Sequence, residues 1–199
     1  EVENNINLSY IWMSDNLEED AVVLTPSFYS TTHLMIFTPA KVFYPPTGLL
    51  TSASDREIIE RYIIASKLFG VSDEKLKELF SYDYIKFAYE NYRSGSNIDI
   101  KKMENNMVDM LMHNGLHSQI WNDKKTFRDL SDIEKMVSDI LQEWQNNQKN
   151  MIAKYEFEYI YVGPYEKDMF SFQEEEFPIC LEIIYNNLDV EIYRKCALR

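Results

Sequence analysis

The stretch that most constrains the fold is residues 155–164, YEFEYIYVGP, because an alternating strand pattern ends here at Gly163 and Pro164. Its first residues alternate aromatic and acidic side chains, and a period of two places neighbouring side chains on opposite faces of a sheet. A long helical pattern precedes it over residues 131–154. The apolar residues of that helix lie along one face: Ile133, Val137, Ile140, Trp144 and Met151. A long helix that leads directly into a strand indicates an α/β fold.

A second strand is predicted at residues 21–24, AVVL, a continuous apolar run typical of a strand that is covered on both faces. Thr25 and Pro26 end it. Before it, Leu8, Ile11 and Trp12 lie at helical spacing and predict a helix. We expect the 21–24 strand and the 155–162 strand to be parallel and central in the sheet.

The segments HLMIF (33–37) and KVFY (41–44) are predicted as two further short strands, and Pro45 and Pro46 close the second. At the other end of the chain, two β-prone runs flank Asn186 and Asn187, which predicts a C-terminal β-hairpin.

A helical block is predicted between these strand regions, over residues of about 54–150. Ser54 and Glu57 have the spacing of a capping box, and Gly70 is placed to end the first helix. Ser72 begins the next helix. The predicted fold class is therefore α/β: a mixed sheet with parallel central strands, a helical insertion and a C-terminal hairpin, in a single domain over residues 1–199.

Composition excludes several functions. The chain has 199 residues and a formal net charge of −13, so a nucleic-acid backbone or an anionic membrane surface would be repelled. No apolar run approaches the roughly 18 residues that a spanning helix needs. The chain opens at Glu1 rather than at Met, and we interpret it as a piece of a longer protein.

The two cysteines, Cys180 and Cys196, lie at either end of the predicted hairpin. No CxxC motif is present, so neither a zinc site nor thioredoxin-like chemistry is predicted. Their positions allow a disulfide across the hairpin, but two ordinary buried or free thiols are the default interpretation.

The strand-edge residues are the candidate binding site. In α/β sheets, ligands collect at the carboxyl ends of the parallel strands. The residues that follow the two predicted central strands therefore form the candidate strand-edge site. They are Thr25, Pro26, Gly163, Pro164, Tyr165 and Glu166.

A second candidate is a cluster of aromatic residues in the helical block. Aromatic rings stack on sugars or on protein partners, although at helical spacing they also serve as core residues. The cluster is a candidate contact surface, and its tyrosines are Tyr82, Tyr84, Tyr89 and Tyr92.

Catalytic and metal-binding patterns are weak. Glu156 and Glu158 share one face of their strand and have the chemistry of an acid–base pair. Ile160 and Val162 follow on the same face, so we interpret the two acids as a solvated strand start. His113 and His117 are four residues apart, yet Asn114-Gly115 separates them and breaks the helix that a metal pair requires. His33 has no visible partner. We therefore predict no metal.

No cofactor is predicted either. The sequence lacks GxGxxG, GxxxxGK[ST] and GxSxG motifs, and its five glycines are too few for a phosphate-cradling loop. The acidic run at residues 172–178 lacks the ligand spacing of a calcium loop.

Two segments carry a resemblance. YIWMSDNLEEDAVVLTP (10–26) resembles the entry to the soluble extracytoplasmic C-terminal domain of polytopic membrane proteins of the glycosyltransferase-C type. MIAKYEFEYIYVGPYEKDMF (151–170) and LDVEIYRK (188–195) are similar to the closing segments of those domains. The middle of the chain matches more loosely, and the WWDYG motif of oligosaccharyltransferases is absent.

The resemblance implies a non-catalytic domain, accessory to a lipid-linked glycosyltransferase whose catalytic acids lie among its membrane helices. The implied partners are its own membrane-embedded domain and a glycan or lipid-linked sugar, and the implied location is the extracytoplasmic face of the cytoplasmic membrane. The alternative is a self-contained ligand- or protein-binding module, which would be cytoplasmic if the resemblance is wrong. A small hydrolase that uses Glu156, Glu158 or Glu166 is a third hypothesis.

Overall fold

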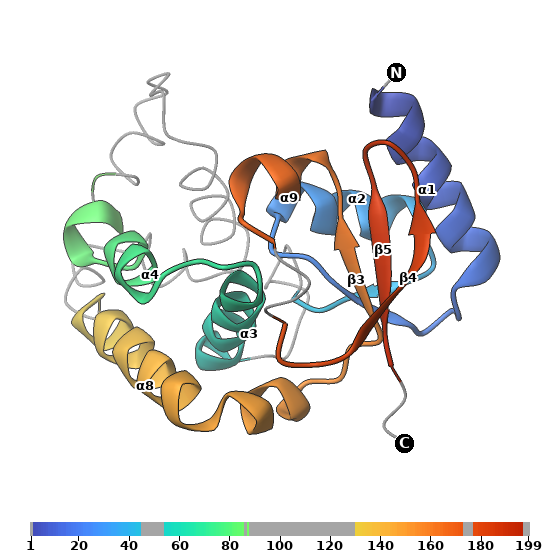
Figure 1. The fold of residues 1–199 in the computed structure, drawn as a ribbon. Coiled ribbons are helices and arrows are strands. Elements are labelled where there is room, and N and C mark those ends of the chain that lie inside the picture. The colour runs from blue at the N-terminus through green and yellow to red at the C-terminus, as the bar shows by residue number, and fades with distance from the viewer. Residues whose placement is uncertain (1, 45–53, 86, 88–129, 173–176, 197–199) are drawn as a thin grey trace.

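The computed structural model describes residues 2–44, 54–85, 87, 130–172 and 177–196. Its centre is a mixed five-stranded sheet of strand order β2-β1-β3-β5-β4 (Figure 1). The strands are β1 (Val22–Leu24), β2 (Lys41–Val42), β3 (Tyr159–Val162), β4 (Leu181–Asn186) and β5 (Glu191–Lys195). β1 pairs in parallel with both β2 and β3, whereas β5 pairs antiparallel with β3 and β4. The predicted fold class, with parallel central strands and a C-terminal hairpin, is confirmed.

Helices lie on both faces of the sheet. α1 (Val2–Asn16) and α2 (Phe28–Phe37) cover one face, where Val23, Tyr161 and Ile192 point into a shared apolar cluster. On the other face, Leu24, Ile160 and Val162 join a larger cluster with the helices of the middle block. Those helices are α3 (Asp55–Leu68), α4 (Asp73–Leu79) and α8 (Leu130–Lys154). Alternate residues of β1 and β3 thus contact different helical layers, as a central strand requires.

The prediction of a strand at residues 33–37 is wrong, because this segment belongs to helix α2. The side chain of Ser27 caps this helix by accepting a hydrogen bond from the backbone N–H of Ser30 at 3.3 Å. The chain requires a helix here because β1 and β2 are parallel neighbours, and a parallel pair is joined by a crossover rather than by a tight turn. The strand predicted at 41–44 is present as the shorter β2.

The helix expected at the start of the chain is present as α1, but its apolar stripe is not the buried one. Ser9, Tyr10 and Met13 are buried, whereas Leu8 and Ile11 are exposed. In the described helices of the middle block, by contrast, the predicted apolar stripes are buried. Those buried residues include Ile58, Ile59, Tyr62, Ile63 and Phe69 of α3–α4 and Val137, Ile140 and Trp144 of α8.

The predicted N-cap residues cap their helices, but the reciprocal half of the Ser54–Glu57 capping box is replaced by an Arg61–Glu57 hydrogen bond. Ser54 and Ser72 accept hydrogen bonds from the backbone N–H groups of Glu57 and Lys75 at the starts of α3 and α4. Gly70 follows α3 with a φ of 79°, a left-handed conformation that favours glycine. The long helix α8 bends at Asn147, whose φ of −146° and ψ of 31° are not helical (Figure 1).

The C-terminal hairpin turns through residues 187–190. The side-chain oxygen of Asn187 accepts hydrogen bonds from the N–H groups of Asp189 and Val190, at 3.0 and 2.8 Å. At the open end of the hairpin, Cys180 and Cys196 form a disulfide, with Cα atoms 5.3 Å apart. The structure thus decides between the two states that the sequence left open. Among the described residues, no helix is long and apolar enough to cross a membrane.

Candidate functional site

The strand-edge residues meet where the sequence predicted, at the carboxyl ends of β1 and β3. Thr25 follows β1 directly and Gly163 follows β3, and the two strands are parallel neighbours. The Thr25 hydroxyl donates a hydrogen bond to Oε1 of Glu166 at 2.6 Å. The Gly163 amide donates to Oε2 of the same carboxyl group at 2.9 Å. One acidic side chain therefore joins the ends of both central strands.

Glu166 reaches this position because it belongs to the first turn of the short helix α9 (Pro164–Met169). Pro164 occupies the first helical position, where its fixed φ suits a helix and its missing N–H costs nothing. Glu166, at the third position, turns back to the backbone N–H of the N-cap residue, as in a capping box. A Cβ atom at Gly163 would lie 2.7 Å from the Tyr161 ring, so only glycine fits this cap.

Burial dominates the electrostatics of this cluster. Glu166 is completely buried, and burial raises the pKa of its carboxyl group because the charged form loses its hydration. Hydrogen bonds from Thr25 and the Gly163 amide act in the opposite direction. The Ser30 hydroxyl lies close enough to do the same, although it makes no hydrogen bond of good geometry. Within the described part of the chain, no cation forms an ion pair with Glu166.

Two tyrosines lie beside this carboxyl group. Burial raises the pKa of Tyr10 to about 12, and it raises the pKa of Tyr161 as well. Their rings stack with centroids 6.0 Å apart. The cluster is therefore an acid surrounded by neutral hydroxyl groups, sealed from solvent by α1, α2 and α9.

This arrangement is suited to holding the fold together rather than to catalysis. A general acid or base must come within hydrogen-bond distance of its substrate. Both oxygens of Glu166 already accept hydrogen bonds from the protein, and the side chain has no exposed surface. Glu166 is therefore a buried cap that fixes α9 against β1 and β3.

The remaining strand-edge residues lie outside this cap. The Pro26 carbonyl oxygen accepts a hydrogen bond from the Tyr44 hydroxyl at 2.7 Å, which ties the end of β1 to the segment after β2. Tyr165 is 38% exposed and stacks on Tyr29 of α2, with ring centroids 5.6 Å apart. This partly exposed aromatic pair joins α9 to α2.

The predicted aromatic contact surface is only partly within the described residues. Tyr82 and Tyr84 are half-buried and pack against the larger core cluster, as expected for core residues. Tyr89 and Tyr92 lie outside the described residues, as do His113 and His117. His33 lies on α2, beside the rings of Tyr10 and Phe37.

The carboxylates that precede β3 are exposed, in agreement with a solvated strand start. Glu156 and Glu158 are both exposed, whereas Tyr155 and Phe157, which alternate with them, are buried. Oε2 of Glu158 accepts a hydrogen bond from the backbone N–H of Val22 at 2.6 Å. Glu158 therefore ties the starts of β1 and β3 together, as Glu166 ties their ends.

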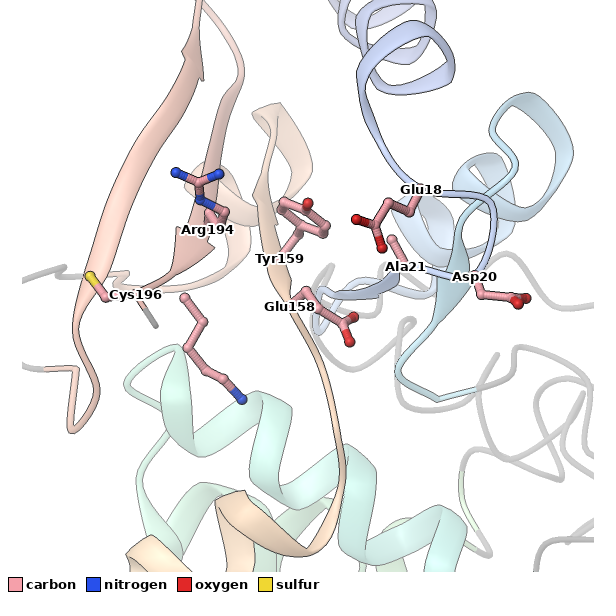
Figure 2. A pocket seen from close by; sticks show the side chains of 8 residues that line it. Glu18, Asp20, Ala21, Glu158, Tyr159, Arg194 and Cys196 are labelled. Carbon is pink, nitrogen blue, oxygen red and sulfur yellow. The ribbon is translucent and has the colours of Figure 1, made fainter. Parts of the chain in front are cut away.

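A hollow lies at this opposite edge of the sheet, and no sequence pattern indicated it (Figure 2). Its volume is about 430 Å³. It lies where the segment before β1 and the start of β3 approach the end of β5, so its lining comes from three distant stretches of chain. The residues that line it are Glu18, Asp20, Ala21, Glu158, Tyr159, Arg194, Lys195 and Cys196.

Charges of opposite sign face this hollow from different elements. The acids Glu18, Asp20 and Glu158 lie on the β1–β3 side, and Arg194 lies on the hairpin (Figure 2). Some of these charges have partners already. Arg194 pairs with Glu182 at 2.7 Å, and Asp20 pairs with Lys41 at 2.7 Å. The hollow can therefore accept a polar ligand by exchanging exposed ion pairs, which are individually weak.

No metal site is evident in the part of the chain that the structure describes. That part contains no group of three or more His, Cys, Asp or Glu side chains arranged to hold a metal ion. Comparison with protein-family models, with curated proteins and with solved structures gave no match. The function must therefore be argued from the residues themselves.

Proposed function

We propose that this chain is a non-catalytic extracytoplasmic domain of a polytopic membrane protein, accessory to a lipid-linked glycosyltransferase. The observation that carries the proposal is the Cys180–Cys196 disulfide. Disulfides persist in oxidising compartments outside the cytoplasm and are rare inside it. The bond therefore supports the extracytoplasmic location over the cytoplasmic alternative.

The closed state of the strand edge supports a non-catalytic role. The carboxyl ends of β1 and β3 are the usual place for a ligand in such a sheet, but here Glu166 fills it and both of its oxygens bind the protein itself. A hydrolase that uses Glu166 would need a substrate to displace those contacts. The exposed Glu156 and Glu158 lack the burial that would tune one carboxyl group for acid catalysis.

The sequence resemblance supplies the partner class. The segments that resemble glycosyltransferase-C-type proteins are residues 10–26, 151–170 and 188–195. They include the second half of α1 and the strands β1, β3 and β5. The three strands are the central strands of the sheet, and α1 packs against the apolar cluster on one of its faces. The residues that carry the resemblance are thus the residues that build the sheet, and they carry over a framework rather than a reaction.

The reading frame upstream of Glu1 provides the first test. The proposal requires several apolar segments long enough to span a membrane before this chain begins. A fusion of alkaline phosphatase to the C-terminus should be active in the cell envelope, because that reporter folds only after export. An upstream frame without such segments, or an alkaline phosphatase fusion that is expressed but inactive, would contradict the proposal.

A second candidate function is a self-contained ligand-binding module, which the hollow favours. Tyr159 and the acids beside it provide an aromatic ring and hydrogen-bond acceptors, the groups that bind sugars. A thermal-shift screen of neutral and amino sugars tests this candidate, with Tyr159→Ala and Glu18→Gln as variants. A shift that both variants abolish supports binding at the hollow. Shifts that persist in both variants place binding elsewhere.

A further inference from the structure

The outer side of helices α1 and α2 carries exposed apolar side chains on neighbouring positions. Ile36 is 65% exposed, Ile11 is 58% exposed and Phe37 is 55% exposed. Leu8 and Met35 are each 46% exposed. These five residues are called the α1–α2 face. Contiguous exposed apolar surface of this kind marks an interaction site on a folded protein.

The two helices form one surface rather than two separate patches. The rings of Tyr10 and Phe37 stack with centroids 5.7 Å apart, which joins α1 to the end of α2. A groove of about 330 Å³ runs between the helices. The residues that line it are Asn7, Tyr10, Ile11, Ser14, Asp15 and Phe37.

The α1–α2 face is almost free of charge in a strongly acidic protein. Charged residues make up 27% of the chain, and its net charge is −13. α2 contains no Asp, Glu, Lys or Arg, and the only charged residues of α1 are Glu3 and Asp15, near its two ends. A medium that cannot solvate ions suits this face better than the rest of the surface.

Several hydroxyl and amide groups around the face donate within the protein, whereas Asn7 and Asp15 of the groove are exposed. Thr32 and Thr38 donate their hydroxyl hydrogens to backbone carbonyls of Phe28 and Leu34 within α2, at 2.9 and 2.7 Å. On α1, Ser14 donates to the carbonyl of Phe37.

Asn16 donates its side-chain amide to the carbonyl of Trp12 at 2.8 Å. The bonds to the carbonyls of Leu34 and Phe37 occupy acceptors in the last turn of α2, which otherwise need water. A protein interface normally makes a hydrogen bond for every 100–200 Å² or so, whereas hydrocarbon offers none. Donors that are turned inward therefore favour lipid as the occupant.

We propose that the α1–α2 face is a lipid-contact surface that seats the domain on a bilayer of zwitterionic lipid. Tyr29 fits this placement, because it lies seven residues from Ile36 on the same side of α2 and is 41% exposed. Tyrosine rings concentrate at the boundary between headgroups and acyl chains. The inference stands on the surface alone and holds whether or not the chain belongs to a glycosyltransferase.

Flotation of the isolated chain with phosphatidylcholine vesicles tests the proposal. The variant Leu8→Asn/Ile11→Asn/Ile36→Asn changes three exposed residues outside the Tyr10–Phe37 stack, so it should fold normally, as circular dichroism will verify. We expect it to lose at least about tenfold in vesicle partitioning, since each buried apolar side chain contributes on the order of 1 kcal/mol or more. Ile183→Asn/Leu188→Asn is the matched control, because these exposed residues lie on the hairpin.

Lipid charge and insertion depth sharpen the test. Vesicles that contain phosphatidylserine should bind the chain more weakly than phosphatidylcholine vesicles, and added salt should reduce the difference. In an Ile36→Trp variant, brominated phosphatidylcholine should quench the new indole, whereas the same substitution at Leu188 should give no quenching.

Three results would overturn the proposal. They are no binding to phosphatidylcholine vesicles, equal losses in the face variant and the hairpin control, and a concentration-dependent dimer that forms through the same three residues without vesicle binding. The last result would identify a second copy of the chain as the occupant.

Discussion

Thr25 and Glu166 are 141 residues apart in the sequence, yet the hydroxyl of one donates to the carboxyl group of the other across 2.6 Å in the protein interior. This bond and the one from the Gly163 amide fasten α9 to the ends of two parallel strands. Thr25 and Glu166 both belong to the strand-edge site, which was the best candidate for a ligand site in the sequence. The structure places that pair inside the fold, where it contributes to stability.

Glu166→Ala should destabilise the chain by about 2–4 kcal/mol, because it leaves the buried Gly163 N–H and Thr25 hydroxyl without an acceptor and opens a small void. Thr25→Val should cost about 1–2 kcal/mol, since it removes one of the two donors. Urea unfolding at a constant m-value measures both changes. If Glu166→Ala unfolds at the wild-type urea concentration, Glu166 is not a structural cap.

Stability should depend on pH through Glu166. Burial raises the pKa of its carboxyl group above the ordinary value of 4.5 in the folded state. Below that value the group is protonated in both states. As pH rises through the folded-state pKa, ionisation favours the unfolded chain and stability is lost.

Glu166→Gln keeps a neutral side chain of the same shape, so its advantage over the wild type should grow as pH rises above about 4.5 and then level off. Urea unfolding from pH 4 to 8 follows this difference. Glu158→Gln, which removes an exposed carboxylate from the same acidic protein, is the control. A constant difference between wild type and Glu166→Gln across this range would contradict the raised pKa.

The disulfide should contribute about 3 kcal/mol to stability, the value expected for a closed loop of this size, since Cys180 and Cys196 are 16 residues apart. Dithiothreitol should lower the melting temperature of the wild type and leave the double variant Cys180→Ser/Cys196→Ser unchanged. Alkylation under denaturing conditions before any reduction should find no free thiol. Two alkylated cysteines in protein purified without reductant would show that the bond does not form.

Glu60 and Lys154 should be strongly coupled. The Glu60 side chain on α3 is 1% exposed, and both of its oxygens accept from the Lys154 ammonium group, at 2.7 and 2.9 Å. Lys154→Met leaves a buried carboxylate with only the more distant Arg56, and should cost about 3 kcal/mol. Glu60→Leu/Lys154→Met should be less destabilised, because it buries no unpaired charge. Additive single effects in a double-mutant cycle would exclude this coupling.

The sheet was predictable because its two central strands have distinct patterns. The apolar run 21–24 indicated a strand buried on both faces, and the alternation at 155–162 indicated a strand with one exposed beginning. Helix caps at Ser54 and Ser72 were equally readable, since their hydrogen bonds are local.

α2 was mispredicted for a physical reason. A short apolar run such as HLMIF has the same local preferences in a buried strand and in a helix. The decision came from topology, because β1 and β2 pair in parallel and must be joined by a crossover.

The candidate sites show the same division between local and non-local information. The meeting of Thr25 with Glu166 followed from the predicted parallel pairing of the strands, but burial of the carboxyl group depends on the cap at Gly163 and on α1 and α2 above it. The hollow was not predictable, because its charged residues come from three segments that are distant in the sequence. Among those charged residues, only Glu158 was a candidate site residue in the sequence.

The location of the domain in intact cells tests the central claim most directly. In spheroplasts that express the whole reading frame, external protease should digest this chain, and the Cys180–Cys196 disulfide should survive in the recovered peptides. Membranes washed with carbonate should retain the undigested protein. Protection from external protease, together with thiols that alkylate without reduction, would place the chain in the cytoplasm and contradict the account.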